Sequence, residues 1–98
     1  MRDLGGLTAD DFEPHRGDVF LATLDDADPV EVTLATVTRS ERRSGERDPF
    51  SLVFNAPPDY PVQQAIHHLE HPVIGALEIF LVPIGADRDK VVYQAVFN

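Results

Sequence analysis

Alternation of apolar and polar residues predicts β-strands along most of the chain after Gly17. Residues 30–38 are rich in β-branched side chains, and residues 76–84 and 91–97 form the clearest strands. Three further strands are expected at 19–24, 50–55 and 64–70. The last of these also fits a short helix, but a tight reversal predicted directly after it favours a strand. The pattern predicts a mainly β fold, either an antiparallel six-stranded meander or a small barrel.

A short N-terminal helix is predicted before the first strand. Thr8 is a favourable N-cap residue, and the acidic residues that follow suit the positive end of a helix dipole. Pro14 and Gly17 limit the helix to residues 9–15. The length of 98 residues is typical of one domain, so we assign 1–98 to a single domain.

Both faces of the predicted strands 76–84 and 91–97 carry apolar residues, which is unusual for a half-solvated antiparallel sheet. The second face is therefore expected to be covered by barrel closure, by the N-terminal helix or by a partner. The interface candidates are Phe80, Val82 and Val92. Phe80 is also a core candidate together with Phe50, and each Phe→Ala change is then expected to cost about 3–5 kcal/mol. Because Phe80 shares a face with Glu78, an interface role for Phe80 stays open.

Composition narrows the classes of partner. The net charge of −9 argues against nucleic acid and against an anionic membrane surface. No apolar run approaches the roughly 20 residues that span a bilayer, and no signal peptide opens the chain. The acidic surface predicts a soluble protein. The charged loop 39–48 contains no apolar residue and is expected to be the most mobile internal segment.

The histidines are the strongest candidates for metal ligands in the sequence, and the strand pattern divides them between two faces. In a strand, His67 and His71 lie on one face with Leu69, while His68 and Glu70 lie on the other. Two histidines fall short of the three or four protein ligands that zinc sites use. We therefore predict no high-affinity metal site, with His67 and His71 as the remaining candidates.

No pattern for catalysis is present. The chain has no cysteine, no Gly-x-Ser-x-Gly elbow and no glycine-rich phosphate loop. No enzyme activity and no cofactor are expected.

Three stretches share a recognisable pattern: residues 7–14 with Gly17, residues 49–54, and residues 69–85 followed by 93–98. Together they resemble a family of short bacterial proteins of unknown function, whose genes often lie beside those of phage-tail-collar-like (microcystin-dependent-type) proteins. The resemblance extends over nearly the whole chain. It implies a role beside a phage-tail-like fibre or collar protein and supplies no catalytic residue.

The expected function is a non-enzymatic protein-binding or assembly accessory module, with a tail-collar-like protein as the partner that the resemblance implies. The alternative is a small-ligand or metal-binding β-barrel. The sequence leaves open whether the chain forms a homo-oligomer. The expected location is the cytoplasm or an exported tail-like assembly.

Overall fold

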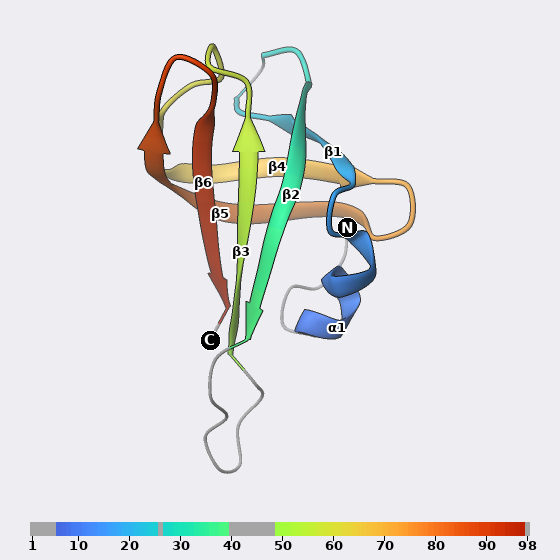
Figure 1. Cartoon of the computed structure of the whole chain (residues 1–98). Helices are drawn as coiled ribbons and strands as arrows, with labels where there is room; N and C mark the ends of the chain where they lie inside the picture. Colours follow the sequence, from blue (N-terminus) through green and yellow to red (C-terminus); the bar gives the residue numbers. More distant parts are fainter. Residues whose placement is uncertain (1–5, 26, 40–48, 98) are drawn as a thin grey trace.

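Six antiparallel strands close into a barrel in the computed structural model, which describes residues 6–25, 27–39 and 49–97 (Figure 1). The elements in chain order are α1 (Ala9–Phe12), the short 3₁₀ helix η2 (Glu13–His15), β1 (Val19–Thr23), β2 (Val30–Arg39), β3 (Phe50–Ala56), β4 (Ala65–His71), β5 (Gly75–Ala86) and β6 (Val91–Phe97). The predicted mainly β fold with one short N-terminal helix is confirmed. Of the two predicted arrangements, a meander and a small barrel, the structure has the barrel.

The order of strands around the barrel is β1-β2-β3-β6-β5-β4. A simple six-stranded meander would place β4 beside β3, whereas here β4 pairs with β1 and β3 pairs with β6. The barrel therefore consists of two three-stranded meanders joined along two seams. The segment whose sequence fitted either a strand or a short helix forms strand β4, which pairs with β1 on one side and with β5 on the other.

Strand β5 turns a corner of the barrel. Its first part, through Leu81, pairs with β4, and its second part, from Val82, pairs with β6. The register shifts between Pro83 and Gly85, where an irregularity bends the strand. Proline suits such a position because it has no N–H group for the ladder. In Figure 1, β4 and β5 cross the directions of β2, β3 and β6 at a steep angle.

The N-terminal helix packs its apolar side against the barrel. Phe12 places its ring 5.9 Å from the ring of Phe50 and 6.0 Å from that of Phe97, measured between centroids. The backbone N–H of Thr8 donates to the Asp11 carboxylate at 2.8 Å, which satisfies a free donor at the start of the helix. The chain then reverses at Gly17, whose φ of +89° is readily adopted by glycine.

The inner face of the sheet forms the core, and one core expectation is wrong. Phe50 is buried and stacks on Phe97 with ring centroids 4.5 Å apart. Phe80, in contrast, is 51% exposed, because Leu81 and its alternate neighbours occupy the inner face of β5. Phe80 thus lies outside the core, and Val82 and Val92 are half-buried. The interface candidates Phe80, Val82 and Val92 therefore lie on the outer wall of the barrel.

Two further expectations concern loops and membranes. The predicted mobile loop 39–48 lies outside the described residues except for Arg39. In the described part of the chain, no helix has the length and apolar character needed to cross a bilayer.

Candidate functional site

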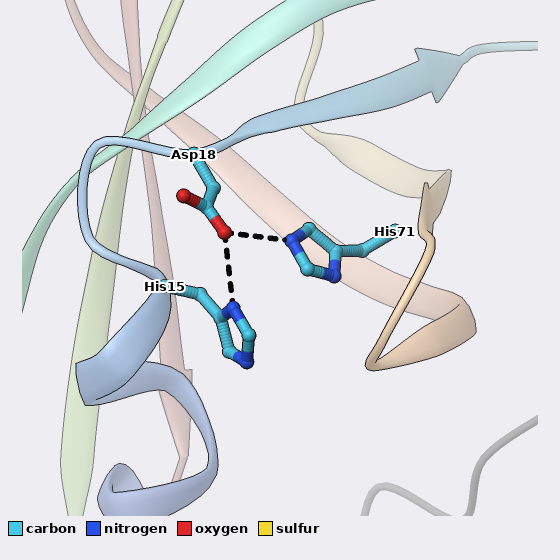
Figure 2. A group of neighbouring side chains, drawn as sticks. All are labelled: His15, Asp18 and His71. Carbon is cyan, nitrogen blue, oxygen red and sulfur yellow. Dashed lines mark hydrogen bonds and ion pairs between the residues drawn. The ribbon is translucent and has the colours of Figure 1, made fainter.

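Three titratable side chains from distant parts of the sequence meet at one end of the barrel (Figure 2). His15 ends η2, Asp18 directly precedes β1, and His71 ends β4. The Asp18 Oδ2 atom accepts hydrogen bonds from His15 Nδ1 at 3.0 Å and from His71 Nε2 at 2.9 Å. Their ligand atoms lie within 4.8 Å of one another, so this cluster is a candidate metal centre among the described residues.

The remaining hydrogen bonds of His71 define which of its nitrogens carries a proton. His71 Nδ1 accepts the backbone N–H groups of Val73 at 3.0 Å and Ile74 at 3.2 Å. Only an unprotonated nitrogen can accept, so the proton of the neutral ring is on Nε2, where it is donated to Asp18. The ring thereby fastens the turn between β4 and β5, and Gly75, at φ +97°, begins β5 directly after this turn. His71 is 7% exposed and has both nitrogens in use.

This arrangement opposes metal binding by His71. A cation at Nε2 would need the lone pair there, and the ring proton would then move to Nδ1, directly against two N–H donors. Without His71, only His15 and Asp18 remain, which is fewer ligands than zinc sites use. The cluster is better described as a hydrogen-bonded clamp between η2, β1 and β4.

Asp18 is the anionic centre of this clamp. The hydrogen bonds from His71 and then from His15 lower the pKa of Asp18 below its ordinary value of 3.8. The carboxylate is therefore charged at neutral pH. The sequence analysis missed Asp18 and His15 because no local spacing connects them with His71, which lies 53 positions after Asp18.

The second histidine candidate belongs to a separate buried network. His67 is fully buried; its Nε2 donates to the Gln63 carbonyl at 3.1 Å, and its Nδ1 accepts from the Tyr60 hydroxyl at 2.7 Å. The Tyr93 hydroxyl donates to the carbonyl of Pro61 and accepts the backbone N–H of Gln63 at 3.0 Å. These bonds tie the β3–β4 connection to the barrel.

Burial sets the protonation states in this network. Desolvation lowers the pKa of His67 below 6.5, and it raises the pKa of Tyr60 to about 12. Both groups are therefore neutral at pH 7. Among the described residues, no buried side-chain polar atom lacks a hydrogen-bond partner, so this network contains no polar group left over for a ligand.

The predicted division of the histidines between two faces is confirmed. His67, Leu69 and His71 are buried, whereas His68 points to the outer face. The structure gives His67 and His71 different partners and does not join them in one site. On the outer face, His68 Nδ1 lies 3.1 Å from Glu78 Oε1, and its Nε2 lies 3.7 Å from Glu70 Oε1.

An exposed apolar pair lies further along the same outer face. Ile66 of β4 is the register partner of Phe80 of β5, and their exposed fractions are 61% and 51%. Val82 follows Phe80 on this face and pairs with Gln94 of β6. We call Ile66, Phe80 and Val82 the outer apolar patch.

A shallow pocket opens at the other end of β4. It has a volume of about 320 Å³. Its lining consists of Val19, Leu21, Glu70, His71 and Pro72. The pocket therefore combines apolar walls with one carboxylate beside the clamp, and we call it the β1–β4 pocket.

Comparisons with known proteins give one result. Residues 7–97 match the model of a family described as a domain of unknown function (DUF6916). No curated protein and no solved structure matches the chain. The expected resemblance to a family of unknown function is confirmed.

Proposed function

We propose that this chain, which belongs to the family of domains of unknown function DUF6916, is a non-enzymatic protein-binding module that docks through its outer apolar patch. The observation that supports this proposal is the cross-strand pair of Ile66 and Phe80, both more than half exposed. An isolated hydrophobic residue on a surface is ordinary. Two large ones side by side, continued by Val82, resemble the apolar centre of an interface.

The surroundings of the patch also suit a protein partner. Gln94 pairs with Val82, and its neighbours on the same face of β6 are Val92 and the exposed Val96. Glu78 and His68 form a polar border on the other side of Phe80. Interfaces concentrate binding energy in a few buried aromatic and aliphatic anchors surrounded by polar residues, and Phe80 is the natural anchor here.

Charge favours a different protein over a second copy. The chain has a net charge of −9, so two copies repel each other at long range. A partner with basic residues around an apolar contact would be attracted instead. The sequence resemblance suggests a tail-collar-like protein as the first partner to test.

The proposal is tested by co-expressing the chain with a tail-collar-like protein from the same genome and measuring the complex by size-exclusion chromatography. We expect a complex that is lost in Phe80→Asp. Val73→Asp is the matched control, because Val73 is also exposed but lies in the turn at the opposite end of the β4–β5 hairpin. Equal binding by wild type and Phe80→Asp would refute the docking surface. Self-association that depends on Phe80 would replace the partner protein with a second copy.

A further inference from the structure

Acidic residues stand on both sides of Leu21, one of the residues that line the β1–β4 pocket. Leu21 of β1 pairs with Glu31 of β2 on one side and with Glu70 of β4 on the other. Residues that pair directly across strands point to the same face, so both carboxylates stand on the outer wall beside Leu21. Val19 and Pro72 complete the apolar lining.

The Glu70 carboxylate is available to a ligand. Its side chain is 56% exposed, and its nearest ion-pair partner among the described residues is His68 Nε2, at 3.7 Å. This distance is longer than a normal hydrogen bond. Asp18 adds a third negative charge close to the pocket, because its carboxylate is hydrogen-bonded to the His71 ring that lines the pocket.

We propose that the β1–β4 pocket binds an arginine side chain presented by the partner protein. This inference rests on the proposed protein-binding function and specifies the chemistry of the partner. The aliphatic part of arginine would pack on Val19, Leu21 and Pro72. Its planar guanidinium group would donate two parallel hydrogen bonds to the Glu70 carboxylate. An anionic ligand is disfavoured by the carboxylates, and a lysine ammonium is more strongly hydrated and lacks the paired donors.

The pocket and the outer apolar patch form one continuous docking face. Ile66 and Glu70 point to the same side of β4 and are four residues apart, which corresponds to about 13 Å along a strand. His68 lies between them, bonded to Glu78. A single partner surface with an apolar anchor and an arginine at this separation would contact both.

The test uses the isolated chain, labelled with ¹⁵N, and two small probes. N-acetyl-arginine amide is compared with N-acetyl-citrulline amide, a neutral analogue of nearly the same shape. Binding of each probe is measured by NMR from the chemical shifts of the backbone amides. We expect saturable shifts at Val19, Leu21 and His71 with the arginine probe, and about tenfold weaker binding of the citrulline probe, equal to about 1.4 kcal/mol.

Two variants link the binding to the pocket carboxylate. Glu70→Gln is expected to remove the preference for arginine over citrulline. Glu78→Gln is the matched control, because Glu78 also contacts His68 but does not line the pocket, and it should retain the preference. Equal binding of both probes, shifts located elsewhere, or an unchanged preference in Glu70→Gln would overturn the inference.

The two proposals fail separately. If Phe80→Asp abolishes the protein complex but the chain does not bind arginine, the docking function is supported and only the arginine pocket is refuted. If the chain binds arginine at Glu70 but forms no complex that depends on Phe80, the pocket is supported and docking through the outer apolar patch is refuted.

Discussion

His67 and His71 are polar residues inside a small barrel, and each uses both ring nitrogens in hydrogen bonds. His71 holds the β4–β5 turn and the Asp18 carboxylate, while His67 holds the β3–β4 connection. A buried polar side chain is stable only when its partners are present, and removing it leaves those partners without a bond. At the scale of the residue, the histidines therefore act as structural connectors, and their loss should be measured first as a loss of stability.

His71→Ala is expected to lower the free energy of unfolding by about 2–4 kcal/mol, because two backbone N–H groups in the turn lose their acceptor. Urea unfolding followed by circular dichroism measures the change. The control is His68→Ala, which removes a partly exposed side chain and should cost less than about 1 kcal/mol. A similar cost for both variants would show that the bonds at Nδ1 contribute nothing.

Zinc is expected to leave the melting temperature unchanged, because no lone pair of His67 or His71 is free. A site that binds only the folded state would raise stability by about 2.7 kcal/mol at a hundredfold excess of metal over its dissociation constant. The measurement is a thermal melt across a zinc titration. A saturable rise that a chelator reverses, and that His15→Ala or His67→Ala removes, would contradict the assignment and favour the ligand-binding barrel.

The six strands show which features of the sequence are sufficient to predict the fold and which are not. The sequence pattern located all six strands, and in residues 50–55 alternation placed Phe50 correctly on the buried face, because a period of two distinguishes the faces when one face is polar. Strand β5 has apolar residues on both faces, so alternation could not say that Phe80 points outward. The pairing of Leu21 with Glu70, and the meeting of His15 with His71, join distant segments that no local pattern connects. The clamp and the pocket therefore required the three-dimensional structure.

The two faces of the sheet predict different costs for two phenylalanines. Phe50→Ala should destabilise the protein by about 3–5 kcal/mol, because Phe50 is buried between Phe12 and Phe97. Phe80→Ala should cost about 1 kcal/mol or less, since half of that side chain is already in water. Chemical denaturation of both variants gives the comparison. A cost above about 3 kcal/mol for Phe80→Ala would mean that the outer wall is packed.

For the molecule as a whole, acid is expected to weaken the fold in two steps. Burial lowers the pKa of His67 below 6.5, so below that pH the unfolded chain takes up a proton before the folded one does. Stability is then fully present above pH 6.5 and falls as the pH decreases. Asp18, whose pKa is lowered from 3.8, contributes stability above that pH, and this contribution disappears at still lower pH.

The measurement is the free energy of unfolding between pH 8 and pH 3. In His67→Gln, whose amide can donate and accept in the same place, the decline between about pH 6.5 and pH 5 should flatten, while the step below about pH 4 should persist. A wild-type curve that is level from pH 8 to pH 5 would show that His67 titrates freely in the folded protein.

The two seams of the barrel also constrain how it forms during synthesis. Leu21 pairs with Glu70 and Phe50 with Phe97, so each seam joins residues about fifty positions apart. The first meander emerges from the ribosome with both of its edge strands unpaired, and it keeps an open edge on β3 until β6 has been made. An unpaired strand edge is a template for association with other chains. The nascent half-barrel is therefore the state most exposed to aggregation, and chaperone dependence should fall sharply once β6 is released.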